Sequence, residues 1–83
     1  MTIDEIDAAL YARIKAADDR YGPFASTHEA LGVIIEEFDE LREAIRSNDL
    51  DRVQQECLDM AAPLIRLAMS INTDSELCAR SVK

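Results

Sequence analysis

The sequence is poor in the residues that build tight turns and aromatic cores. Its 83 residues include no tryptophan, two glycines and two prolines, and aromatic residues make up only 5% of the chain. The core must therefore be aliphatic, and few positions are available for the turns that a protein of many short strands needs. β-branched residues are sparse as well, so the composition favours a helical protein.

Basic leader segments and long apolar runs are also missing. The first ten residues, MTIDEIDAAL, are acidic and lack the positive start and apolar run of a signal peptide. The most apolar stretch, MAAPLIRLAMSI, is interrupted by Arg66 and falls short of the roughly 20 residues that a membrane span needs. Cys57 and Cys78 form neither a CxxC pair nor a disulfide framework. We therefore expect reduced thiols in the cytoplasm and no membrane partner.

Basic residues are few: 9 lysines and arginines stand against 17 aspartates and glutamates, a formal net charge of -8. Nucleic acids and anionic membranes are bound through basic surfaces, so neither is an expected partner. The charge permits a bound cation, a basic protein partner or a surface that only keeps the protein soluble. The chain length fits one domain over residues 1–83, and because so small a domain buries a modest fraction of its surface, we expect self-association.

Start and stop signals predict three helices. The first begins after Thr2, which has capping-box spacing with Glu5, and ends before the Gly22–Pro23 pair. The second begins after Ser26, again with a glutamate three residues later, and ends in RSND, residues 46–49. The third begins at the end of that segment. A short fourth helix or tail is expected from about residue 72.

The second and third predicted helices each carry an apolar seam with alternating three- and four-residue steps, as in coiled coils. The first seam consists of Leu31, Ile34, Phe38, Leu41 and Ile45. The second consists of Leu50, Val53, Cys57, Met60, Leu64, Leu67 and Ile71. Two antiparallel helices with a short turn follow, and Cys57 becomes a core thiol. The predicted fold is all-α: a helical hairpin with an N-terminal helix, forming a four-helix-type bundle completed by oligomerisation.

The segment EEFDELREAI, residues 36–45, begins with four acidic residues in five. Glu37 and Glu40 are three apart on the second helix, and Glu56 and Asp59 have the same spacing on the third, so each pair lies on one helix face. Antiparallel packing would gather both pairs along one edge of the hairpin. Two unit charges about 4 Å apart repel by on the order of 4 kcal/mol at an effective dielectric near 20. Converging carboxylates therefore need protonation, water or a cation such as Mg²⁺ or Mn²⁺. An acidic face that only meets water is the alternative.

The two segments EEFDE and ECLD, with 15 residues between Glu40 and Glu56, resemble the EExxE and ExxD motifs of the MazG-like, all-α nucleoside triphosphate pyrophosphohydrolases. The resemblance covers residues from about 21 to 76. It implies hydrolysis of nucleoside triphosphates to the monophosphate and pyrophosphate, by homodimers or homotetramers that use Mg²⁺. It makes Glu37, Glu40, Glu56 and Asp59 metal ligands, and Glu36 an outer carboxylate or a residue that orients the attacking water.

Three further residues are candidates for substrate binding. Arg66 lies seven residues after Asp59, about 10 Å along the same helix, and is a candidate for a terminal phosphate; a salt bridge or a solvent-facing position is the alternative. Phe24, with Tyr21, lies where the resemblance implies the nucleobase pocket, although loop aromatics also close the ends of bundles. His28, the only histidine, is in the first turn of its helix, where a surface position is the default and contact with a base the alternative.

Three functions remain open from the sequence. The first is a Mg²⁺-dependent nucleotide pyrophosphohydrolase, with a role in removing non-standard nucleotides or controlling the nucleotide pool by analogy with the family. The second is a non-catalytic, acidic helical interaction protein that binds a basic partner. The third is a helical assembly module without a ligand.

Overall fold

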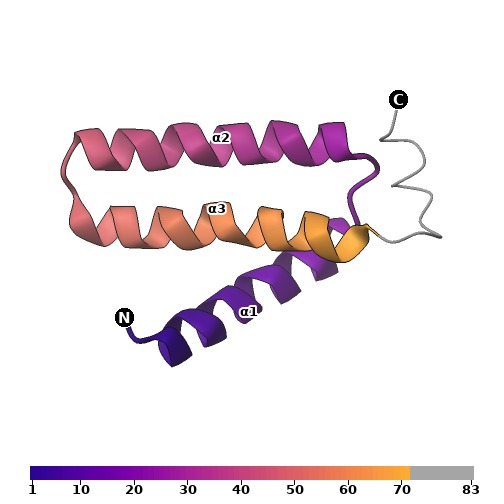
Figure 1. Ribbon diagram of the computed structural model, residues 1–83, viewed down its shortest axis with the longest axis horizontal. Coiled ribbons are helices and arrows are strands. Elements are labelled where there is room, and N and C mark those ends of the chain that lie inside the picture. Colours follow the sequence, from indigo (N-terminus) through magenta and orange to yellow (C-terminus); the bar gives the residue numbers. More distant parts are fainter. Residues whose placement is uncertain (72–83) are drawn as a thin grey trace.

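The computed structural model describes residues 1–71, and within that range every element is a helix (Figure 1). The helices are α1 (Ile3–Tyr21), α2 (Thr27–Arg46) and α3 (Leu50–Ser70). The all-α prediction is confirmed for this part of the chain. The short fourth helix expected from about residue 72 lies outside the described residues. No helix in the described range has the length and apolarity that crossing a membrane requires.

Local capping signals set the first helix boundaries. Thr2 and Glu5 form the predicted capping box: the Thr2 Oγ1 accepts a hydrogen bond from the Glu5 N–H at 3.2 Å, and the Glu5 carboxylate accepts one from the Thr2 N–H at 2.8 Å. Gly22 ends α1 with φ 70°, a left-handed backbone that glycine adopts without steric penalty. Ser26 caps α2 through the N–H of Glu29, as predicted.

The turn between α2 and α3 consists of residues 47–49. Its Asn48 has φ 58°, and asparagine is one of the few residues other than glycine that tolerates this region. Asp49 then caps α3 by accepting a hydrogen bond from the N–H of Arg52. The predicted end of the second helix and start of the third are confirmed.

The helices α2 and α3 lie side by side and antiparallel, and α1 crosses α3 obliquely with few contacts to α2 (Figure 1). Ala30 and Ala44 on α2 are fully buried, so the two hairpin backbones approach closely. Phe24 packs on Ala30 at the end of the hairpin, and the partly buried Val33, Ile34 and Leu67 complete this cluster. The helical hairpin with an N-terminal helix is therefore present, with a small core.

The structure divides each predicted apolar seam between two environments. On α2, Ile34 and Leu41 are partly buried in the hairpin, whereas Phe38 is 47% exposed. On α3, Met60 is partly buried but Cys57 is exposed, so the prediction of a core thiol is wrong. The physical reason is that each seam is wider than the contact with one neighbouring helix. The half of each seam turned away from the hairpin contact has no covering element within residues 1–71.

Candidate metal centre

Three of the four predicted metal ligands converge between α2 and α3. One carboxylate oxygen from each of Glu37, Glu56 and Asp59 lies within 4.8 Å of the others. Glu56 and Asp59 are neighbours on α3, as their spacing predicted, and Glu37 comes from the facing helix. We call these three residues the carboxylate triad.

Glu37 belongs to the packed surface of α2. It lies seven residues from both Ala30 and Ala44, so the three residues lie along the helix face that meets α3. The two alanines are fully buried and let α3 come close, and Glu37 is itself only partly exposed. The acidic residues of this part of α2 therefore lie in two environments: Glu37 faces α3, while Glu36 and Glu40 are solvent-exposed.

Both glutamates of the triad have a raised pKa. Burial, together with the nearby charges of Glu40, Asp59 and Glu56, raises the pKa of Glu37 to about 7. Burial also raises the pKa of Glu56, with further contributions from Glu40 and Asp59. Glu40 lies outside the triad itself, but it acts electrostatically on both glutamates.

One triad oxygen has no partner. The Oε2 atom of Glu37 is buried and accepts no hydrogen bond from any described residue. A buried carboxylate oxygen without a donor is costly, and the usual remedies are a proton, an ordered water or a cation. This atom is the observation in the structure that most directly fits a divalent ion.

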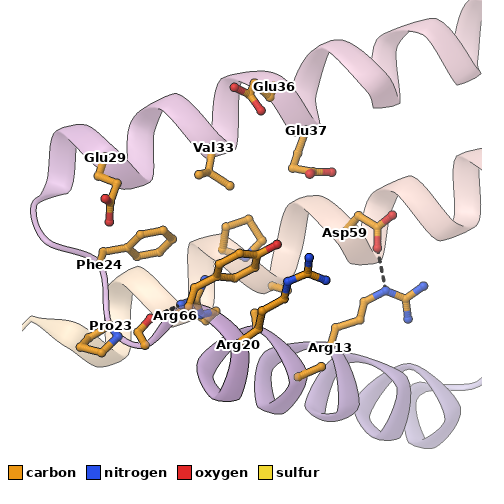
Figure 2. Close-up of a pocket in the computed structure, with 16 residues that line it drawn as sticks. Arg13, Arg20, Pro23, Phe24, Glu29, Val33, Glu36, Glu37, Asp59 and Arg66 are labelled. Carbon is orange, nitrogen blue, oxygen red and sulfur yellow. Dashed lines mark hydrogen bonds and ion pairs between the residues drawn. The ribbon is translucent and has the colours of Figure 1, made fainter.

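Two arginines contact the triad from its outer sides. The Arg13 Nε on α1 is 2.8 Å from the Asp59 Oδ1 (Figure 2). Its Nη2 donates a hydrogen bond to the Gln55 Oε1 at 2.6 Å. Arg52 is 3.5 Å from Glu56, one turn away on α3. These contacts offset part of the negative charge on Asp59 and Glu56. Neither arginine is paired with Glu37.

A cavity of about 740 Å³ opens beside the triad, between α1 and α2 and over α3 (Figure 2). Glu36, Glu37 and Asp59 line one part of it, and the Tyr21–Phe24 loop lines the part farther along α1. This volume lies within the range of pockets that hold small molecules, about 300–1,000 Å³. Carboxylates and apolar side chains thus share one concave site.

The predicted substrate-binding residues have different positions. Arg66 is buried: its Nε is 2.8 Å from the Asp18 Oδ1, its Nη2 donates to the Gly22 carbonyl at 2.6 Å, and its guanidinium stacks 4.5 Å from the centre of the Phe24 ring. Arg66 and Phe24 line the cavity while also joining α3 to the α1–α2 loop. His28 is exposed, as its default reading predicted, and does not line this cavity.

The sequence interpretation overlooked the arginines of α1. Arg13 and Arg20 both line the cavity, and Arg13 contacts a triad residue. Arg13 and Asp59 are 46 positions apart in the sequence, so no local spacing predicts their contact. The available signal was the sequence RIKAADDR, in which two arginines seven residues apart occupy one helix face.

Comparison of the chain with protein-family models, curated proteins and solved structures finds no match.

Proposed function

We propose that the protein is a Mg²⁺-dependent nucleoside triphosphate pyrophosphohydrolase. The observation that carries this proposal is the carboxylate triad of Glu37, Glu56 and Asp59, with its unpartnered Glu37 oxygen, beside a ligand-sized cavity that Glu37 and Asp59 line. The same three residues belong to the two sequence motifs that resemble those of the MazG-like family.

The donor set fits a hard divalent cation. All three groups are carboxylates, which Mg²⁺ and Mn²⁺ prefer together with water and phosphate oxygens. Glu40, one turn from Glu37 and electrostatically coupled to it, would complete the ligand set. When bound, the ion would neutralise triphosphate charge and lower the pKa of a water molecule.

The protein's own residues would bind and orient the nucleotide. The Tyr21 and Phe24 rings, with Val33, form an apolar end of the cavity where a base would lie, leaving its phosphates toward the triad. Glu36 lines the cavity beside Glu37 and is exposed, so its carboxylate would accept a hydrogen bond from the attacking water. No serine, cysteine or histidine nucleophile is required.

The assembly we propose is a pair of hairpins packed through the apolar face that the described residues leave uncovered. On α2 this face contains Leu31, Ile35, Phe38 and Ile45, and on α3 it contains Leu50, Cys57 and Leu64, with Ile71 at the C-cap. Helix periodicity puts both groups on the side of the hairpin away from α1. A second copy packed there would complete a four-helix bundle and bury a surface that monomers rarely expose. Phe38→Lys should then shift sedimentation toward the monomer, whereas Arg42→Lys should not.

Release of pyrophosphate from a panel of standard and modified nucleoside triphosphates tests the activity. We expect Mg²⁺-dependent release, and a loss of at least about 100-fold in Asp59→Asn, because an interaction with the transition state is removed. Asp39→Asn is the matched control, since Asp39 is exposed and pairs only with Arg42 in the described structure. Wild-type protein that binds no divalent ion and hydrolyses nothing would refute the proposal and favour the acidic interaction protein.

A further inference from the structure

The cavity has walls of opposite charge. Its α2 wall carries Glu29, Glu36 and Glu37, and its α1 wall carries Arg13 and Arg20. Figure 2 shows both arginine side chains directed from α1 toward the space below α2. An anion that bridges these walls would meet positive charge on one side and, on the other, carboxylates that require a cation.

The α1 wall also has room for a ligand. Ala16 and Ala17 lie between the two arginines and line the cavity with them, so the four residues follow the i, i+3, i+4, i+7 pattern of one helix face. The arginines are two turns apart, about 10 Å along the axis. The small alanine side chains leave the space between the two guanidinium groups open.

Arg20 is available for a ligand. It is exposed and lies 5.3 Å from the Tyr21 ring centre, and it forms no ion pair with another residue in the range 1–71. Arg66, the third arginine of the cavity, is committed to Asp18, to the Gly22 carbonyl and to the Phe24 ring. Of the cavity arginines, Arg20 is thus the one without a fixed anionic or carbonyl partner in the described structure.

Arg13 stands at the junction of the two walls. Its Nε is held by Asp59, a triad carboxylate, and its side chain is 28% exposed. A cation on Asp59 would compete with this ion pair, and the released guanidinium would be beside any phosphate that the same cation binds. Arginine suits that exchange because its planar fork pairs equally well with carboxylate and phosphate oxygens.

We propose that the Arg13–Ala16–Ala17–Arg20 face of α1 is a polyphosphate-binding wall, which supplies the positive charge that the carboxylate triad lacks. This inference rests on the proposed function, since it assigns the phosphate contacts of the same cavity. It also names α1, which lies outside both sequence motifs, as a part of the substrate site.

Calorimetric titration with inorganic tripolyphosphate in the presence of Mg²⁺ tests the wall without any turnover of a nucleotide. Arg20→Gln should weaken tripolyphosphate binding about tenfold, in line with the loss of one charge-assisted hydrogen bond. Arg42→Gln makes the same charge change on an exposed face and should leave the affinity unchanged. Arg20 is exposed, so its substitution should not disturb folding.

Arg13→Gln gives a second test, because the affinities for Mg²⁺ and for tripolyphosphate should respond to it differently. Removing the competing guanidinium should leave binding of Mg²⁺ alone unchanged or tighter, while tripolyphosphate binding weakens. A purely structural ion pair would instead weaken Mg²⁺ binding, and that result would overturn the role of Arg13. Wild-type binding of Mg²⁺ and tripolyphosphate with no change in Arg20→Gln would overturn the wall but leave the proposed function standing. Wild-type protein that binds neither ligand would overturn both.

Discussion

Glu37→Gln tests whether the triad is a strained anionic site, because it removes one charge and keeps the shape of the side chain. Burial and neighbouring carboxylates raise the pKa of Glu37 from 4.5 to about 7. A shift of one pKa unit corresponds to about 1.36 kcal/mol, so a fully ionised Glu37 would lower the free energy of unfolding by about 3 kcal/mol. Solvent reaches part of this side chain, so screening reduces the expected penalty to about 1–2 kcal/mol.

The sign of the effect follows from the raised pKa. Below pH 4.5, Glu37 is protonated in both the folded and the unfolded chain, and wild type and variant should have similar stability. Between pH 4.5 and about 7 the wild type loses stability, because Glu37 has lost its proton in the unfolded chain but still holds it in the folded chain, and above pH 7 the loss is complete. At pH 8 without divalent ions, Glu37→Gln should therefore be more stable by about 1–2 kcal/mol.

Added Mg²⁺ should reduce this advantage. For a dissociation constant of about 1 mM, 10 mM Mg²⁺ would stabilise the wild type by about 1.4 kcal/mol through binding to the folded state. The variant, which lacks the buried anionic oxygen, should gain little. In a domain of this size, each kcal/mol of change in the free energy of unfolding shifts the melting temperature by about 4–8 °C.

Thermal unfolding at pH 4 and pH 8, with and without Mg²⁺ and at one protein concentration, measures the stability under all four conditions. Glu43→Gln is the control, because Glu43 is exposed on α2 and does not line the cavity. The reasoning is refuted if Glu37→Gln is less stable than the wild type at pH 8 without metal, or if both variants respond equally to Mg²⁺.

Three other properties of the protein can be measured directly. The affinity for Mg²⁺ should weaken as the pH falls below about 7, because protons compete for Glu37; calorimetry at several pH values checks this. Arg66→Met should lower the free energy of unfolding, measured in urea, by about 2–3 kcal/mol, because Asp18 and the Gly22 carbonyl lose charge-assisted hydrogen bonds. A change below about 0.5 kcal/mol, which is the scatter of neutral surface substitutions, would contradict this. Asn48 has a positive φ, which glycine tolerates and a β-branched residue does not. Asn48→Gly should therefore raise the free energy of unfolding by about 0.5–1 kcal/mol, and Asn48→Val should lower it by about 1–2 kcal/mol.

The helices and their ends were predictable because their signals are local. Thr2, Ser26 and Asp49 each cap a helix through a backbone N–H three residues on, and such pairs are visible in sequence. The i, i+3 spacing of Glu56 and Asp59 was predictive for the same reason. The convergence of Glu37 on them required only one further assumption, an antiparallel hairpin.

The environment of each apolar residue was less predictable, because spacing does not say how many neighbours a helix has. Phe38 and Cys57 share the seams with partly buried residues yet are exposed. The line of Ala30, Glu37 and Ala44 was overlooked because small side chains weigh little in an apolar pattern, although they mark where two backbones come closest. Arg13 could not be placed at all, since its contact with Asp59 depends on the angle at which α1 crosses α3.

The oblique course of α1 places Arg13 and Arg20 on a different helix from the carboxylates of the triad. All three triad residues belong to α2 and α3, while the arginine wall belongs to α1, which contacts mainly α3. A change in the tilt of α1 would therefore widen or narrow the cavity without displacing the two helices that carry the triad, although it would also alter the Arg13–Asp59 ion pair. The width of the cavity thus depends on the tilt of α1, whereas the distances among the triad carboxylates depend on the packing of α2 against α3, and the Arg13–Asp59 ion pair links the two.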